Sequence, residues 1–308
     1  MTELSKQILG QYQVRKTKKQ KNAFIQLIQE HFPEAVVQTG RLPASRNLII
    51  GDMEKARVIY GAHYDTCAQL PFPNFIAPKR PLLSICYSFL VMMPIILIII
   101  ALDFLLGYVN ADFWVVYVIN LLSLCGLLFL IIAGKANKHT ANDNTSGVIT
   151  VLEILQNLSP EQREHAVFVL FDNEEIGLMG SALFRKKFKK QVEEIPFFNF
   201  DCVSDGDYLL LAPTKDARKH LEAIQRAFQS TGNKQIVIEN GEKIYYPSDQ
   251  IGFTMGIAVA ALKMSKRIGY YMDRIHTKRD VIFDEENITL LTNSAIEFIN
   301  YLDEGTPK

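Results

Sequence analysis

Imidazole and carboxylate side chains follow several predicted buried strands of this chain of 308 residues. "ARVIYGAH" is predicted to be a buried strand that ends at His63, and Asp65 follows on the same face. "HAVFVLFDNEE" ends in the adjacent Glu174 and Glu175, and "PFFNFD" ends in Asp201. Because open α/β sheets carry their sites at the carboxyl ends of strands, these side chains are expected to lie together. Taken singly, each pattern is more typical of a structural or solvated group.

Two further segments offer the same kinds of group. Asp143 in "ANDNTSGV" precedes a predicted helix, where it could equally serve as a helix cap. His276 in "RIHTKRD" lies in a late loop, with Asp280 four residues further on. Five residues together make the ligand set that two zinc-like ions need when one carboxylate bridges them: His63, Asp143, Glu175, Asp201 and His276.

The order of these motifs resembles the co-catalytic zinc exopeptidases related to bacterial leucyl aminopeptidases and glutamate carboxypeptidase. That family has His-x-Asp, Asp-Asn-x-Ser-Gly, Glu-Glu-x-Gly-x-x-Gly-Ser, a strand-end Asp and a late His-Thr. This chain has "HYD", "DNTSG", "EEIGLMGS", "NFD" and "IHT" in the same order. The resemblance covers residues 15–80 and 136–303, nearly everything outside two apolar runs described below.

The resemblance implies a role for each ligand. One ion would be bound by His63 and Asp201. The other would be bound by Glu175 and His276, and Asp143 would bridge the two. The implied cofactors are therefore two divalent metal ions, with Zn²⁺ as the metal of the family.

Other implied roles support these ions. Glu174 would be the general base, and Asp65 would be the partner that orients His63. The family holds its bridging carboxylate with a cis peptide bond, which predicts such a bond between Asp143 and Asn144.

The implied reaction is hydrolysis of a peptide bond near the end of a peptide substrate. The metals lower the pKa of a water between them, and Glu174 takes its proton and passes it to the leaving amine. An aminopeptidase is favoured over a carboxypeptidase, because a free amino terminus can bind near the metals. "YPSDQIGF" resembles a segment beside the family's substrate pocket: Ser248 and Asp249 match it, whereas Gln250 stands where His is usual. Substrate binding by this segment is therefore left open.

Two other classes of protein compete with a peptidase. The same fold occurs in glutaminyl cyclases, which are acyltransferases with a single metal. It also occurs in receptor and scaffold domains that have lost ligands and catalysis. The complete ligand set argues against both alternatives.

The predicted fold is α/β, with a mostly parallel central sheet and helices on both faces. Short strands are predicted at 35–40, 46–51, 56–63, 165–172, 196–201, 208–212, 235–239 and 267–272. Helices are predicted at 5–31, 145–158, 173–188 (after a loop), 216–230 and 287–302.

Residues 81–102 and 113–134 contain no Asp, Glu, Lys or Arg. Each could cross about 30 Å of hydrocarbon as a helix. Because residues 103–112 are too few for a domain, the runs predict a transmembrane helical hairpin over 81–135. This hairpin would interrupt one peptidase domain made of 1–80 and 136–308. Two buried core helices are the alternative.

Charge predicts the orientation of the hairpin and the partners of the protein. Basic residues flank its outer ends and acidic residues lie in its loop, so the catalytic domain is expected to be cytoplasmic on a cell membrane, with two spans. No cleavable signal peptide is predicted, and the active-site rim should face the lipid and peptides held there. The basic residues at the outer ends of the hairpin are Lys79, Arg80, Lys135 and Lys138, and the acidic residues in its loop are Asp103 and Asp112.

The bulk composition excludes some partners. Lys plus Arg and Asp plus Glu number 33 each, and the chain has no nucleic-acid motif, so no nucleic-acid partner is expected. The four cysteines show no paired spacing and are expected to be reduced thiols. Basic runs at 15–21 and 185–190 are expected to be either solvated helix faces or contacts with anionic lipid.

Overall fold

The central strands are apolar along their whole length, which is typical of a sheet covered on both faces. Every residue of β3 (Val58–His63), β4 (Ala166–Phe171) and β5 (Phe197–Phe200) is buried. Side chains of β3 alternate between two cores, because Tyr60 packs on one face of the sheet and Ile59 on the other. The strand that ends at His63 therefore lies in the middle of the molecule.

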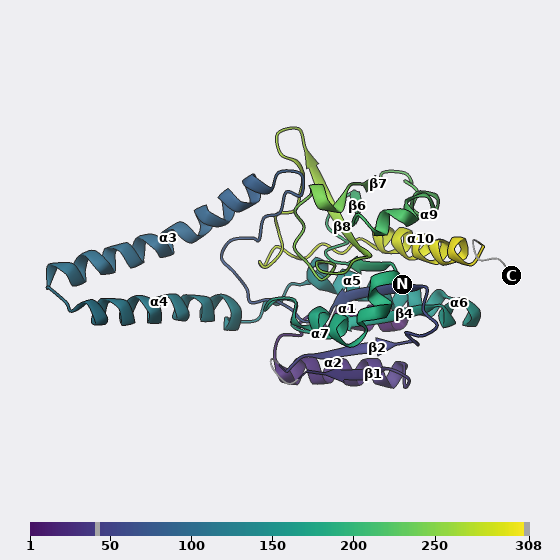
Figure 1. The fold of residues 1–308 in the computed structure, drawn as a ribbon, viewed down its shortest axis with the longest axis horizontal. Helices are drawn as coiled ribbons and strands as arrows, with labels where there is room; N and C mark the ends of the chain where they lie inside the picture. The colour runs from purple at the N-terminus through teal and green to yellow at the C-terminus, as the bar shows by residue number, and fades with distance from the viewer. Residues whose placement is uncertain (41–43, 305–308) are drawn as a thin grey trace.

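The structure, a computed structural model, describes residues 1–40 and 44–304 and contains a nine-stranded sheet (Figure 1). The strand order is β1-β2-β4-β3-β5-β8-β6-β7, and β9 pairs with β8. The four central strands β4, β3, β5 and β8 are parallel, whereas β1, β2, β6 and β9 have antiparallel neighbours. The prediction of a mostly parallel sheet is thus wrong at the edges, and the sheet is mixed. The remaining strands are β1 (Val36–Thr39), β2 (Arg46–Ile50), β6 (Tyr208–Pro213), β7 (Gln235–Ile238), β8 (Gly256–Ser265) and β9 (Gly269–Tyr271).

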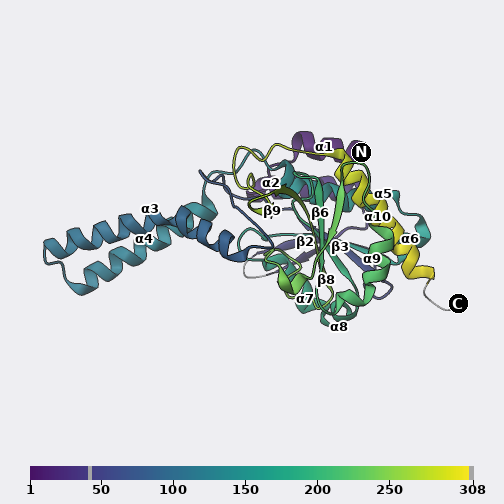
Figure 2. The same cartoon turned by 90° about the horizontal axis from the view of Figure 1, so that it is seen from above.

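Helices cover both faces of the sheet, as predicted (Figure 2). One face of the sheet packs on α1, α2, α5, α9 and α10, and the other face packs on α7 and α8. These helices are α1 (Glu3–Gln11), α2 (Lys18–His31), α5 (Gly147–Asn157), α9 (Leu221–Ala227), α10 (Glu285–Glu304), α7 (Met179–Lys187) and α8 (Lys189–Glu194), and the short α6 (Pro160–Glu164) precedes β4.

Three local predictions fail for identifiable reasons. The helix predicted over 5–31 is two helices, because Thr17 caps a new start and forms a capping box with Gln20. The helix predicted over 216–230 is α-helical only in α9, after a 3₁₀ turn. Strand β8 was not predicted at all, because its sequence is rich in alanine, which has a low strand propensity.

Two members of the first basic run are structural. Arg15 is completely buried, and its guanidinium donates to Tyr64 O and, over 3.1 Å, to Thr145 Oγ1. Lys21 is also buried and forms an ion pair of 2.5 Å with Asp172. Neither a solvated face nor lipid contact describes these two side chains. They attach the N-terminal helices to the ends of β3 and β4.

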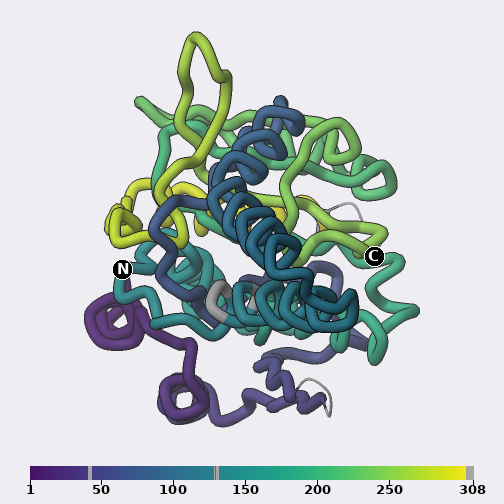
Figure 3. Tube along the Cα trace, turned by 90° about the vertical axis from the view of Figure 1, so that its left-hand side faces the viewer, coloured from purple at the N-terminus to yellow at the C-terminus, as the bar shows by residue number. Residues whose placement is uncertain are grey.

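An antiparallel helical hairpin projects from the domain on the side away from α6 (Figures 1 and 2) and is seen end-on in Figure 3. It consists of α3 (Pro81–Tyr108) and α4 (Phe113–Ala133). The most apolar stretch of α3 is 0% buried inside the molecule, so α3 is not a core helix. Within the described residues, α3 alone is long and apolar enough to cross a membrane, and the apolar part of α4 is shorter (Phe113–Leu127). The second predicted span is therefore not shown.

The predicted ends of the hairpin helices also need correction. The first helix continues to Tyr108 rather than 102, and the second ends at Ala133 rather than 134. The connection is therefore only 109–112, and Asp103 lies inside α3, where it accepts a hydrogen bond of 2.6 Å from Asn120 of α4.

Both ends of the hairpin are paired at its base. Ala68 and Ala136 form an antiparallel bridge, and Gln69 N donates to Lys135 O over 2.8 Å. The two ends of the insertion therefore lie side by side. In addition, Leu70 N donates to His276 O over 2.8 Å, so the segment that enters the hairpin is bonded directly to a predicted ligand segment.

Candidate metal centre

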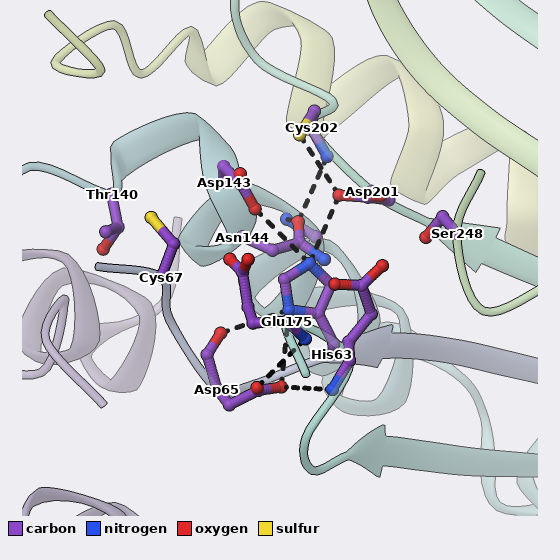
Figure 4. Close-up of polar contacts among 12 residues, drawn as sticks. His63, Asp65, Cys67, Thr140, Asp143, Asn144, Glu175, Asp201, Cys202 and Ser248 are labelled. Atoms are coloured by element: carbon purple, nitrogen blue, oxygen red, sulfur yellow. Dashed lines mark hydrogen bonds and ion pairs between the residues drawn. The ribbon is translucent and has the colours of Figure 1, made fainter. Parts of the chain in front are cut away.

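The parallel centre of the sheet brings the predicted ligands together. His63 is the last residue of β3, and Asp201 directly follows β5. Glu174 and Glu175 follow β4 after two residues, and Asp143 lies in an irregular turn that leads into α5. Figure 4 shows His63 with Asp143 and Asp201 on one side of its ring and Asp65 on the other. One small volume is thus lined by the five residues placed above: His63, Asp143, Glu174, Glu175 and Asp201.

The spacing of their ligand atoms matches a metal site. His63 Nε2 lies 3.4 Å from Asp143 Oδ1 and 3.4 Å from Asp201 Oδ1. His276 Nε2 lies 3.1 Å from Asp143 Oδ2 and 3.3 Å from Glu175 Oε2. Two ligands of a tetrahedral zinc ion with bonds of about 2.0–2.1 Å are themselves roughly 3.3 Å apart. The observed separations therefore suit ions placed between these atoms.

Asp143 is shared by the two sets of contacts. Its Oδ1 faces His63, its Oδ2 faces His276, and its side chain is only 4% exposed. Such a carboxylate can bind one cation with each oxygen. The geometry therefore fits a bridging position.

Glu175 provides an independent test of whether a cation fits. Its Oε1 is buried and has no hydrogen-bond partner. Burial, followed by the repulsion of Asp143, raises its pKa to about 8, although His276 opposes this shift. An unpaired buried carboxylate oxygen is costly unless a cation or donor meets it. The residues present therefore fit a metal.

Glu174 is close to the same centre, but it lies with His63 and Asp201 rather than with Glu175 and His276. Its carboxylate lies within 4.8 Å of the ligand atoms of His63 and Asp201. Burial raises its pKa well above that of an ordinary glutamate, and the charges of Glu175 and Asp249 add to this shift. Glu174 and Glu175 thus point to different parts of the site, as their separate predicted roles require.

Cys67 was not singled out from the sequence. Its thiol lies within 4.8 Å of the ligand atoms of Asp143, Glu175 and His276. Burial, then the charges of Glu175 and Asp143, raise its pKa well above the usual value. The position of this cysteine two residues after Asp65 was the signal that could have revealed it, since alternate residues of an extended segment share one face.

Asp65 holds the glutamate loop as well as the histidine. Its Oδ1 accepts from Glu174 N over 3.0 Å, and its Oδ2 accepts from Glu175 N over 3.3 Å. His63 Nδ1 lies 3.1 Å from the backbone oxygen of Asp65 and 3.7 Å from its carboxylate. Contact with the ring therefore runs mainly through the backbone, while the carboxylate positions both glutamates.

Asp280 supports Asp143 in the same way. Its Oδ2 accepts from Asp143 N over 3.0 Å, and its Oδ1 accepts from Asn142 N over 2.8 Å. The predicted cis peptide bond between Asp143 and Asn144 is present, and Asn144 Nδ2 donates to Phe200 O over 2.9 Å. The turn that carries Asp143 is thus fixed from two sides.

Left-handed backbone conformations accompany three ligand segments. Asn173 precedes Glu174 with φ 61°, Cys202 follows Asp201 with φ 56°, and His276 itself has φ 64°. Residues other than glycine adopt this region rarely, and such residues cluster at functional sites.

The three residues considered for substrate binding are not part of the ligand group. Ser248 Oγ and Gln250 Oε1 both accept from Asn199 Nδ2, over 2.8 and 3.0 Å. Asp249 is completely buried, neither of its oxygens has a hydrogen-bond partner, and burial raises its pKa to about 7. Ser248 and Gln250 thus both bind Asn199 near the carboxyl end of β5. Asp249 places a further buried carboxyl group near Glu174.

Comparison with known proteins agrees with this geometry. The sequence pattern of peptidase family M28 matches residues 131–299, more than half of the chain. This range includes four of the five predicted ligands together with Glu174, whereas His63 and Asp65 precede it. No curated protein matches the sequence.

Two solved structures share the fold. The LapA aminopeptidase of Legionella pneumophila superposes with a TM-score of 0.57 at 14% identity, over 100% of this chain and 71% of that one. A glutaminyl cyclase from Porphyromonas gingivalis gives a TM-score of 0.58 at 15% identity, over 98% and 96% of the two chains.

The mixed α/β fold, together with the family match over more than half of the chain, identifies a metallopeptidase. The chain belongs to peptidase family M28.

We expect Asp65→Asn to weaken metal binding about 10–100-fold, as loss of support for a ligand typically does. The amide would replace one of the two acceptors that hold the backbone of Glu174 and Glu175. Competition with a chromogenic chelator measures the affinity. Asp216→Asn, an exposed change before α9, is the control and should bind metal as the unchanged protein does. Unaltered affinity in Asp65→Asn would contradict this role.

Proposed function

We propose that this chain is a membrane-anchored, zinc-dependent exopeptidase that acts as an aminopeptidase. The observation that carries the proposal is the carboxylate of Asp143, whose two oxygens face His63 and His276 separately. His63 and Asp201 would hold one ion, and Glu175 with His276 would hold the other. Asp143 would bridge them.

Glu174 is proposed to move the proton. When bound, the ions would lower the pKa of a water and polarise the scissile carbonyl. Glu174 would accept the proton of that water at its carboxylate and deliver it to the leaving amine. Its burial beside His63 keeps the proton near the reacting atoms, and Asp65 keeps the loop in place through two backbone amides.

The carboxyl groups of the site support an aminopeptidase. Asp249 and Glu174 lie next to the ligands, and a substrate ammonium group beside them would favour the charged form that burial disfavours. The cavity that adjoins His276 has no Lys or Arg among its described lining residues. A carboxypeptidase needs a cation for the terminal carboxylate of its substrate, and this cavity does not provide one.

Peptides with free and blocked amino termini test this proposal. We expect cleavage of Leu-initiated peptides, no cleavage of their N-acetylated forms, and loss of cleavage with a chelator. Elemental analysis of active protein should give two divalent ions per chain, and a metal-loaded structure should place them about 3.5–4 Å apart. Turnover of the acetylated peptides alone, or one ion per fully active chain, would contradict the proposal.

Adjacent glutamates allow a matched test of the two roles. Glu174→Gln should keep the fold and the metals yet lower kcat about 10²–10⁴-fold, because the amide cannot accept the proton. Glu175→Gln should instead lower metal affinity, because it removes a charged ligand. Circular dichroism, metal content and turnover are measured for both variants. Metal loss in the first and rate loss alone in the second would reverse the assignment.

A glutaminyl cyclase is the second candidate, because a protein of that activity shares the fold over nearly its whole length. That reaction uses an N-terminal glutamine and releases ammonia. The presence of two donor groups around Asp143 favours the peptidase over this alternative. Ammonia released from a Gln-initiated peptide by a protein with one ion would favour the cyclase.

Several features support insertion of residues 81–135 into a bilayer, within a discontinuous peptidase domain of 1–80 and 136–308. Helix α3 is apolar and unburied. Aromatic side chains gather at the tip of the hairpin and are exposed: Tyr108, Phe113, Trp114 and Tyr117. Such residues are enriched at membrane–water interfaces. Lys79, Arg80, Lys135 and Lys138 flank the base, whereas the tip has Asp112 and no Lys or Arg, which supports a cytoplasmic domain.

Protease protection tests this placement. We expect the protein to require detergent for extraction from membranes, and an external protease on spheroplasts to reach only the connection at 109–112. Cleavage inside the catalytic domain on intact spheroplasts would reverse the orientation. Release by salt alone would remove the membrane proposal.

A further inference from the structure

A cavity of about 410 Å³ lies between the candidate metal centre and the hairpin. His276 lines it from the metal centre, and Leu70 and Phe72 line it from the segment that enters the hairpin. Met92 and its neighbours on α3 form the opposite wall. A larger cavity beside α10, of about 620 Å³, contains none of the candidate ligands. The cavity next to His276 therefore lies within direct reach of the proposed chemistry.

One stripe of α3 faces this cavity. Its members recur every three or four residues, as one face of a helix requires: Tyr87, Ser88, Val91, Met92 and Ile95. Phe89, Leu90 and Met93 lie on the remaining surface and are 64%, 61% and 48% exposed. The same helix thus offers one face to the catalytic domain and another to its surroundings.

The domain holds the start of α3 in a defined position. Ser84 Oγ is buried and accepts from Ala77 N over 2.8 Å. The ring of Tyr87 packs on Phe75 with centroids 5.2 Å apart, and Phe75 also stacks on Tyr271. Leu70 is tied to His276 through the backbone. One wall of the cavity is thereby bonded to the backbone of His276, and the wall formed by α3 is held on the catalytic domain.

The lining of the cavity selects the chemistry of its occupant. Among the described residues that line it there is no Asp, Glu, Lys or Arg, and most are aliphatic, aromatic or proline. A charged side chain would lose its hydration there without gaining a partner. Volumes of about 300–1,000 Å³ with apolar walls are typical of binding sites. Because His276 belongs to both the cavity and the candidate metal centre, an occupant of the cavity would lie next to that centre.

We propose that α3 is part of the substrate site, and that the cavity holds the apolar side chains next to the scissile bond of a peptide derived from the membrane. This inference rests on the proposed peptidase function and adds its substrate class: peptides with an apolar N-terminal segment. Such a segment reaches the cavity along a helix that is itself apolar on its outer face, without first entering water.

Two neighbouring methionines provide the matched test. Met92→Trp fills the cavity, whereas Met93→Trp changes the exposed face of the same turn. Full-length protein in phosphatidylcholine nanodiscs is assayed with Leu-Phe-Val-Ala-Lys and Ala-Ser-Gly-Ala-Lys. We expect Met92→Trp to lower kcat/KM for the first peptide by about tenfold or more and for the second by much less, in line with pocket discrimination. Met93→Trp should leave both values within twofold.

Binding separates this inference from the proposed function. A fluorescent Leu-Phe-Val-Ala-Lys peptide is titrated into the Glu174→Gln variant with and without Met92→Trp. Loss of binding on Met92→Trp, even in a protein that cleaves no peptide, supports the cavity as a peptide site. Equal effects of Met92→Trp on both peptides in an active enzyme overturn it and leave the peptidase intact. Displacement of the bound peptide by oleate, together with hydrolysis that is indifferent to Met92→Trp, identifies a lipid site and also overturns it.

Discussion

Buried negative charge is the constraint on which the rest of this structure depends. Asp65, Asp143 and Asp201 are at most 6% exposed, and Glu174 and Glu175 stand beside them. Burying one ion costs several kcal/mol after relaxation, and like charges at this range repel strongly. The two imidazoles, together with the buried Arg15 and Lys21, are fewer than these five carboxylates. The arrangement is consistent with a site that receives cations, and the fold is built to present it to them.

Backbone dipoles carry much of that support. Asp65 and Asp280 each accept two main-chain N–H groups, and in this way they fix the segments that carry Glu174, Glu175 and Asp143. Lys21 meets Asp172 at the end of β4, so a side chain from the N-terminal helices contributes the cation at that point. Of these supporting groups, Asp65 was predicted to act at the site, whereas the contacts of Asp280 and Lys21 were not predicted.

The candidate ligand segments were predictable because a strand end is a local feature. A buried apolar run followed by a carboxylate or imidazole can be read without knowledge of contacts, and His63, Glu175 and Asp201 were found in this way. Cys67 was not, since its role as a neighbour of the site depends on the path of an irregular segment. The mixed edges of the sheet and strand β8 also escaped prediction, because strand direction follows from pairing over long sequence distances and alanine is a weak strand signal. The contacts of Arg15 and Lys21 are also with residues distant in sequence, so the sequence did not distinguish these buried side chains from a basic surface.

The unequal helices of the hairpin have a consequence for height. With 28 and 21 residues, α3 exceeds α4 by seven, which is two helical turns or about 10 Å of rise. Those extra turns are the ones that Ser84 and Tyr87 fasten to the domain. In the proposed membrane arrangement, the excess of α3 would stand in the headgroup layer, which extends several ångströms beyond the hydrocarbon on each side. The longer helix would then act as a spacer that sets the distance between the hydrocarbon layer and the catalytic domain.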